Sequence, residues 1–280
     1  MIPAEFDYVE PSTLEEALQI LAARGEDAKV LAGGHSLVPL MKLRLAQPGV
    51  LVYLGRIPGL KGISLDGQRL RIGGMTTHAE VAASPLVRQH APALAQAAHE
   101  IGDRQVRARG TIGGSLAHND PAADLPAVML ALDAEMKLRS ASGERTLKAE
   151  PFLVGMLETA LRPDEILTEV SVAVSPRSAY VKFPNPASHY AITGVGVALQ
   201  GNGTVTAARV GVTGAAPLAY RSAGAEAALT GKSLSAESIS AAANAAYDGR
   251  ELLSDIFASA EYRSMLVRVL TKRALEKISG

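Results

Sequence analysis

The 280-residue chain contains no cysteine and no tryptophan. The absence of cysteine excludes a disulfide bond, a cysteine nucleophile, and any zinc or iron–sulfur site held by thiolates of this chain. Aromatic residues make up only 4% of the sequence, which disfavours the stacking platforms that bind single-stranded nucleic acid. Any redox chemistry must therefore depend on an organic cofactor or on a partner subunit.

The chain also has no excess of charge of either sign, because 28 Lys and Arg residues balance 28 Asp and Glu residues. This balance gives no electrostatic reason to expect nucleic acid or an anionic membrane as a partner. No apolar run approaches the roughly 18 residues that span a bilayer. Residues 1–7 lack the basic and apolar regions of a signal peptide, so we expect a cytoplasmic protein without a membrane span.

The composition, 48% hydrophobic and 20% charged, is that of a globular protein with one large domain or two ordinary ones. Ser12 and Glu15 form a capping-box pattern before a helix that ends at Gly25. A strong strand at 165–174 stops at Ser175 and Pro176, which predicts a domain boundary there. Residues 29–36 are predicted as a short strand that runs into a glycine turn. The other predicted strands are 49–55, 69–74, 178–183, 192–200 and 204–214, and the other predicted helical segments are 77–101, 222–230, 235–248 and 260–277.

Two glycine pairs, Gly33-Gly34 and Gly113-Gly114, are each followed by a serine within two residues. We interpret both as turns in which the backbone approaches a ligand closely and successive N–H groups cradle phosphate oxygens. One such pair would be weak evidence, but two suit a ligand with two phosphates. The Rossmann and Walker glycine motifs are absent, so a dinucleotide would have to bind in another fold.

Two other readings of the polar residues find less support. His118, Asp120 and Asp124 could suggest a metal site, but they lack helical ligand spacing, and Asp120 before Pro121 is typical of a turn cap. Ser36 with His35, His118 and Asp124 could suggest a hydrolytic triad, but no nucleophile-elbow motif surrounds the serine. We therefore assign no catalytic residue and no metal ligand.

Four segments resemble the FAD-binding medium subunit of molybdenum hydroxylases of the carbon-monoxide-dehydrogenase and xanthine-dehydrogenase type. They are A-G-G-H-S-L-V-P-L-M-K-L-R-L-A (32–46), R-A-R-G-T-I-G-G-S-L-A-H-N-D-P-A-A-D-L-P (107–126), L-R-P-D-E-I-L-T-E-V (161–170) and A-S-A-E-Y-R-S-M-L-V-R-V-L-T-K-R-A-L (258–275). The resemblance implies an α+β protein. A two-subdomain FAD-binding fold of the vanillyl-alcohol-oxidase (PCMH) type would span 1–176, and a smaller α+β C-terminal domain would span 177–280.

The same resemblance implies a function and partners. A small subunit with [2Fe–2S] clusters would deliver electrons to non-covalently bound FAD, and the FAD would pass them to an external acceptor such as quinone or oxygen. A large molybdopterin subunit would oxidise the substrate, which the sequence does not identify. We expect a dimer of heterotrimers in the cytoplasm, associated with the inner face of the membrane only through the complex.

The resemblance also implies which residues hold FAD. Asp124 corresponds to a partner of FAD polar groups, Leu161 and Lys182 to positions near the flavin or its ribityl phosphate, and Tyr190 to an aromatic residue beside the isoalloxazine. The stretch F-P-N-P-A-S-H-Y (183–190) departs from the basic, glycine-containing stretch of relatives. The diphosphate would contact Ala32, Gly33, Gly34, His35 and Ser36 in the first loop, and Thr111, Ile112, Gly113, Gly114 and Ser115 in the second. Leu37 would be a further FAD-binding residue.

Two rival functions remain open from the sequence. The first is a self-contained FAD oxidase of the vanillyl-alcohol-oxidase type, in some of which a histidine in a G-G-H-S loop bonds covalently to the flavin. The second is a nucleotide-binding structural or regulatory subunit without turnover. A flavin that is bleached by dithionite would favour either flavoprotein over the second rival.

Overall fold

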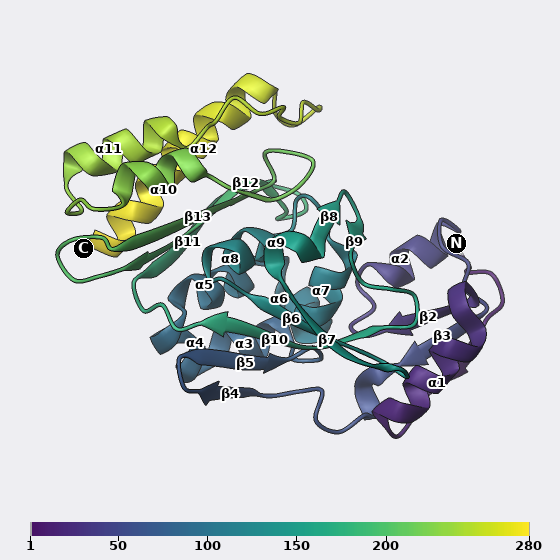
Figure 1. Cartoon of the computed structure of the whole chain (residues 1–280). Coiled ribbons are helices and arrows are strands. Elements are labelled where there is room, and N and C mark those ends of the chain that lie inside the picture. The colour runs from purple at the N-terminus through teal and green to yellow at the C-terminus, as the bar shows by residue number, and fades with distance from the viewer. Residues whose placement is uncertain (1, 280) are drawn as a thin grey trace.

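The computed structural model describes residues 2–279, which form three parts arranged side by side (Figure 1). The N-terminal part is a parallel sheet of β1 (Asp7–Val9), β3 (Val50–Tyr53) and β2 (Ala28–Leu31), in that order. Helix α1 (Leu14–Arg24) connects β1 to β2 and buries Leu18 and Leu21. Helix α2 (Leu37–Lys42) and two 3₁₀ turns, Gly25–Asp27 and Leu54–Arg56, complete this part.

The predicted cap of the first helix is wrong by one residue. Thr13, not Ser12, is the N-cap, and its hydroxyl accepts a hydrogen bond from the Glu16 N–H. The Glu16 carboxylate in turn accepts from the Ser12 N–H, so Glu16 takes the part that we assigned to Glu15. Both residue pairs have suitable side chains, and the sequence pattern alone does not decide between them.

The central part is an antiparallel sheet in the order β4–β5–β10–β6–β7. Its strands are β4 (Ile63–Asp66), β5 (Arg69–Gly73), β10 (Ile166–Ala173), β6 (Glu135–Ser140) and β7 (Gly143–Lys148). The hairpin β8 (Leu153–Gly155) and β9 (Glu158–Thr159) precedes β10. The helices of this part are α3 (His78–Ala83), α4 (Pro85–His90), α5 (Pro92–Glu100), α6 (Arg104–Arg109), α7 (Ile112–His118), α8 (Leu125–Ala131) and α9 (Ala149–Phe152).

The structure corrects one prediction in the central part. Residues 110–115 do not form a turn, because Thr111 caps α7 and Gly113 and Gly114 lie in its first turn. The buried helix α8 lies just before the strands β6 and β7. The segment predicted to be helical between 77 and 101 comprises α3, α4 and α5, because Pro85 and Pro92 each begin a new helix.

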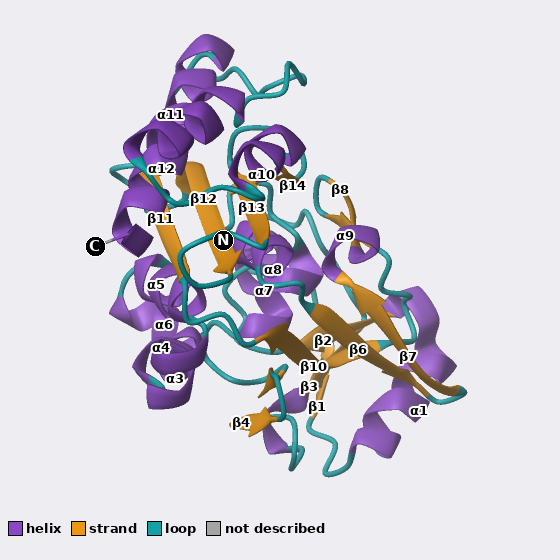
Figure 2. Ribbon diagram, turned by 60° about the vertical axis from the view of Figure 1, so that its left-hand side comes forward, coloured by secondary structure: helices purple, strands orange, loops and turns teal. Residues whose placement is uncertain are grey.

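The C-terminal part is an antiparallel sheet of β11 (Ser178–Pro184), β12 (Ala191–Gln200), β13 (Ala207–Thr213) and β14 (Tyr220–Arg221). Helices α10 (Ala223–Leu229), α11 (Ala236–Ala245) and α12 (Ala260–Ser279) cover one face of it (Figure 2). The sheet also packs against α5 and α8 of the central part. The molecule is therefore an α+β protein, and no helix within residues 2–279 is both long and apolar enough to cross a membrane.

Candidate cofactor-binding site

A cleft of about 710 Å³ lies between the N-terminal and central parts and reaches the loop after β11. Most of its lining is apolar, as in sites for large organic cofactors. Two residues of the predicted site, Ile112 and Lys182, do not line it, since Ile112 is buried in the core and Lys182 lies behind Asp124. The predicted residues that do line it are Ala32, Gly33, Gly34, His35, Ser36, Leu37, Thr111, Gly113, Gly114, Ser115, Asp124, Leu161 and Tyr190.

The first glycine loop, residues 32–36, connects β2 to α2 and presents backbone N–H groups at the cleft. Among residues 2–279, none accepts a hydrogen bond from the backbone N–H groups of 33–36. Gly34 has a φ of 78°, a conformation that favours glycine, and a Cβ on Gly33 would lie 2.2 Å from the carbonyl oxygen of Arg109. Four consecutive unpaired N–H groups at a cleft suit an anion such as a diphosphate.

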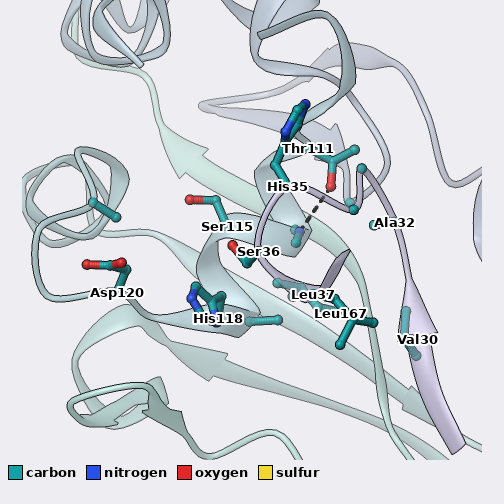
Figure 3. A pocket seen from close by; sticks show the side chains of 18 of the residues that line it. Val30, Ala32, His35, Ser36, Leu37, Thr111, Ser115, His118, Asp120 and Leu167 are labelled. Atoms are coloured by element: carbon teal, nitrogen blue, oxygen red, sulfur yellow. Dashed lines mark hydrogen bonds between the residues drawn. The ribbon is translucent and has the colours of Figure 1, made fainter. Parts of the chain in front are cut away.

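The second glycine segment uses its N–H groups within the protein. Ile112 donates to the Thr76 carbonyl at 3.0 Å and Gly113 to the Gly74 carbonyl at 2.9 Å. The Gly114 N–H donates to Thr111 Oγ1 at 3.1 Å (Figure 3). The Ser115 N–H donates to the Thr111 carbonyl oxygen at 3.0 Å. This segment therefore offers the cleft a closely packed wall and the Ser115 side chain, but no free N–H group from Ile112 to Ser115.

His78 is a polar residue of the cleft that the sequence analysis missed. It is 4% exposed, its N–H donates to the Gly110 carbonyl, and its Nδ1 has no partner among the described residues. Burial lowers the pKa of His78 to about 4, and the nearby charges of His35 and Arg107 act in the same direction. The imidazole is therefore neutral at pH 7, and its unpartnered nitrogen is of the kind that a bound ligand or water satisfies.

Asp124 lies at the cleft, with Lys182 and Tyr180 behind it. Its carboxylate accepts from Lys182 Nζ at 3.0 Å and from the Tyr180 hydroxyl at 2.6 Å. Burial raises the pKa of Asp124, and the Lys182 ammonium and Tyr180 hydroxyl oppose that rise. Burial also raises the pKa of Tyr180 well above its usual value. Lys182 therefore orients Asp124 and does not reach the cleft itself.

The unusual stretch 183–190 closes into a short, hydrogen-bonded loop. Asn185 Oδ1 accepts from the N–H groups of Ala187 and Ser188, and Lys182 Nζ donates to the His189 carbonyl at 2.6 Å. His189 has a φ of 61°. This course brings Ser188, His189 and Tyr190 to the cleft despite the two prolines.

The sequence analysis also missed the β8–β9 hairpin and the segment after it. Leu157, Glu158, Thr159 and Arg162 line the cleft beside the predicted Leu161. A short strand pair between two turns carries no chemical motif, so no sequence signal marked it. Asp120 instead caps a turn as predicted, since its Oδ1 accepts from the Ala122 N–H at 2.8 Å. No cluster of three or more potential metal ligands occurs within 2–279.

The four N–H donors of 33–36, a largely apolar cleft and an imidazole nitrogen without a partner among the described residues fit a dinucleotide cofactor with a diphosphate at its centre. The chain also matches two family models in succession. Residues 4–174 match "FAD binding domain in molybdopterin dehydrogenase", and residues 178–278 match "CO dehydrogenase flavoprotein C-terminal domain". The class of protein is therefore an FAD-binding oxidoreductase component.

Relatives and solved structures match along the whole chain. The carbon monoxide dehydrogenase medium chain of Hydrogenophaga pseudoflava is 40% identical over 98% of this chain and 97% of its own. The 6-hydroxypseudooxynicotine dehydrogenase complex subunit alpha of Paenarthrobacter nicotinovorans is 41% identical over 99% and 95%. A structure of the Hydrogenophaga carbon monoxide dehydrogenase matches with a TM-score of 0.93 at 41% identity, covering 99% of this chain and 98% of that one. The chain belongs to the family of FAD-binding medium subunits of carbon-monoxide-dehydrogenase-type molybdenum hydroxylases, as its resemblance indicated.

Proposed function

We propose that this chain binds FAD non-covalently in the cleft and carries electrons from [2Fe–2S] clusters of a small partner subunit to an external acceptor such as quinone or oxygen. The observation that carries the proposal is the run of four unpaired N–H groups at 33–36, in a chain of this family. Bound FAD supplies the redox chemistry. The chain has no cysteine with which to hold a cluster, so the clusters must come from a partner.

The residues of the cleft have distinct roles in this proposal. The N–H groups from Gly33 to Ser36 bind the diphosphate, and the Ser36 and Ser115 hydroxyls add donors beside them. Asp124, held by Lys182 and Tyr180, accepts from polar groups of FAD. Ala32, Leu37, Leu161 and Tyr190 supply contact surface, with Tyr190 beside the isoalloxazine. Ile112 supports the second segment from the core. No residue has to act as a general acid or base.

The proposed partners are the small [2Fe–2S] subunit and a large molybdopterin subunit, in a dimer of heterotrimers. The description of relatives as medium chains and subunits of dehydrogenases supports a multi-subunit complex. We place it in the cytoplasm, with contact to the inner face of the membrane only through the complex. We assign residues 1–176 to the FAD-binding domain and 177–280 to the C-terminal domain.

In this proposal the flavin subunit does not determine the substrate of the complex. Relatives of similar length belong to dehydrogenases of carbon monoxide, a nicotine derivative and glyceraldehyde. Substrates that share so little chemistry indicate that the flavin subunit does not select among them. We therefore propose that the large partner subunit determines the substrate.

Co-purification tests this function. We expect the protein from its native host to be yellow, bleached by dithionite, and accompanied by one small iron–sulfur subunit and one large molybdenum subunit. Mass spectrometry and metal analysis identify both. A lone chain that oxidises an organic substrate without metals would support the oxidase rival, and a colourless chain without flavin affinity would support the structural one.

A further inference from the structure

The β8–β9 hairpin forms one wall of the cleft but is held weakly by its own strand pairing. Its strands pair only at Leu153 with Thr159 and at Gly155 with Glu158, with an irregularity between the two pairs. Leu157 and Glu158 line the cleft at the hairpin tip, although Leu157 is 55% exposed. So short a ladder does not fix the position of a cleft wall, and a further contact must do so.

Asn119 supplies that contact. Its Nδ2 donates to the Gly155 carbonyl and to the Glu158 carbonyl, both at 2.8 Å. Its own carbonyl accepts from the Leu157 N–H at 3.1 Å. Asn119 is 2% exposed, so water does not compete for these hydrogen bonds. Three hydrogen bonds from one residue therefore hold the hairpin tip.

The backbone of Asn119 ties the same hairpin to the second glycine segment. Asn119 ends α7 in the left-handed conformation, with a φ of 48°, and its N–H donates to the Ser115 carbonyl. Asparagine and glycine tolerate this conformation better than most residues. Leu157 also has a left-handed φ, 58°, which is costly for a leucine and persists only where surrounding contacts hold it.

The neighbouring part of the wall has its own anchor. Arg145 pairs with the Glu165 carboxylate at 2.6 Å and donates to the Ala160 carbonyl at the same distance. The Arg162 N–H donates to the same carboxylate. Residues 160–165 are therefore fixed independently, and the Asn119 contacts act on 155–158.

We propose that Asn119 is a positioning residue for FAD, whose side-chain amide holds the hairpin tip as a wall of the cleft and slows release of the cofactor. The inference rests on the proposed function, because it takes FAD as the occupant of the cleft. Without the amide, the hydrogen bonds that remain at the tip within residues 2–279 are the one from the Leu157 N–H and those of the two strand pairs. Removing the amide leaves in place every protein group that we propose to contact FAD directly.

Two substitutions separate the amide from the backbone conformation. Asn119→Gly keeps the left-handed backbone and the bond from the Leu157 N–H, and removes only the two amide bonds. Asn119→Asp keeps the shape of the side chain but has no N–H to donate. We expect both variants, isolated in the complex, to release FAD about tenfold faster than wild type, the scale of one or two hydrogen bonds. The rate of backbone amide hydrogen exchange at residues 155–158 should rise in both variants.

Asn244→Gly is the matched control, because it introduces the same residue into the exposed face of α11, far from the cleft. It weakens a helix and should leave FAD release unchanged. Wild-type release rates in both Asn119 variants, with wild-type protein retaining FAD, would overturn this inference alone and leave a structural role for Asn119. A wild-type complex without flavin would overturn the proposed function and this inference together.

Discussion

Lys182 Nζ lies 3.0 Å from Asp124 Oδ1, and the two side chains are only 2% and 5% exposed. The pair joins the start of α8 in the central part to β11 in the C-terminal part. Lys182 also donates to the carbonyls of Glu100 and His189, so one ammonium group fixes three segments. The C-terminal sheet therefore contributes to the cleft by orienting Asp124 as well as through the Ser188–Tyr190 loop.

The first prediction concerns this pair. Lys182→Met leaves the Asp124 carboxylate buried without its cation, and we expect it to lower the free energy of unfolding by about 3 kcal/mol. Asp124→Asn should cost a similar amount because it leaves the ammonium without its anion. Urea unfolding of the single and double variants measures the coupling. The double variant should lose clearly less unfolding free energy than the two single variants lose together. If the losses of the single variants add up to that of the double variant, the interaction between Lys182 and Asp124 does not stabilise the fold.

The second prediction tests the first glycine loop. Gly34→Val places a β-branched side chain at a φ of 78° in the loop with the free N–H groups. We expect a loss of FAD affinity of at least about tenfold, because the loop must leave the conformation that presents its donors. Equilibrium titration with FAD, followed by flavin fluorescence, measures it.

Gly67→Val is the control for that substitution. Gly67 has a φ of 57° in the turn between β4 and β5, away from the cleft, and nothing lies within 4 Å of a Cβ there. Its backbone strain is comparable, so stability should fall in both variants while only Gly34→Val loses FAD. Equal FAD binding by both variants would show that the first loop is only a structural turn.

The family could be recognised from four segments of the sequence that resemble it, and most elements could be predicted because strand and helix periodicities are local signals. It was less reliable where tertiary contacts decide the local structure. Residues 110–115 look like a glycine turn, yet Ile112 and Leu116 are fully buried in the core and Thr111 caps the helix, so α7 forms through the glycine pair. A run such as Leu125–Ala131, buried on all sides, has no periodicity that distinguishes helix from strand.

In the candidate site, too, local features could be predicted from the sequence and features that depend on tertiary contacts could not. The first glycine loop could be predicted because Gly34 has a positive φ, a backbone requirement that marks glycine turns in a sequence. Lys182 was assigned to the flavin region by resemblance, but the fold places it behind Asp124. Asn119 and His78 were missed, because their importance depends on residues far away in the chain: Gly155 and Glu158 for Asn119, and Gly110 for His78.

The third prediction follows from the lowered pKa of His78. An unfolded histidine takes up a proton below about pH 6.5, whereas folded His78 stays neutral down to about pH 4. The unfolded state therefore binds more protons in this window, and the contribution of His78 to stability is present above pH 6.5 and lost as the pH falls to 4. The full loss is about 3 kcal/mol.

Unfolding free energies of wild type and His78→Phe between pH 7.5 and pH 4 measure this contribution. Because carboxylates also titrate there, the informative quantity is the difference between the two pH profiles. We expect wild type to lose more stability than His78→Phe on acidification. The exposed His99 provides the control, and His99→Phe should follow the wild-type profile. Parallel profiles for His78→Phe and wild type would show that His78 titrates normally.

The last prediction separates the medium-subunit function from the covalent oxidase, and it concerns His35. Its imidazole is exposed and points away from the side chains of Ser36 and His118 in Figure 3. It sits in the loop whose N–H groups suit the diphosphate, whereas we place the isoalloxazine beside Tyr190. Covalent attachment would require the imidazole to reach a ring methyl group in a fixed geometry, and a histidine at the diphosphate is not in that position. Acid precipitation of the yellow protein should therefore release FAD into the supernatant, and His35→Ala should still be yellow before precipitation. Colour that stays with the pellet in wild type and is absent from the pellet of His35→Ala would establish a covalent flavin and favour the oxidase.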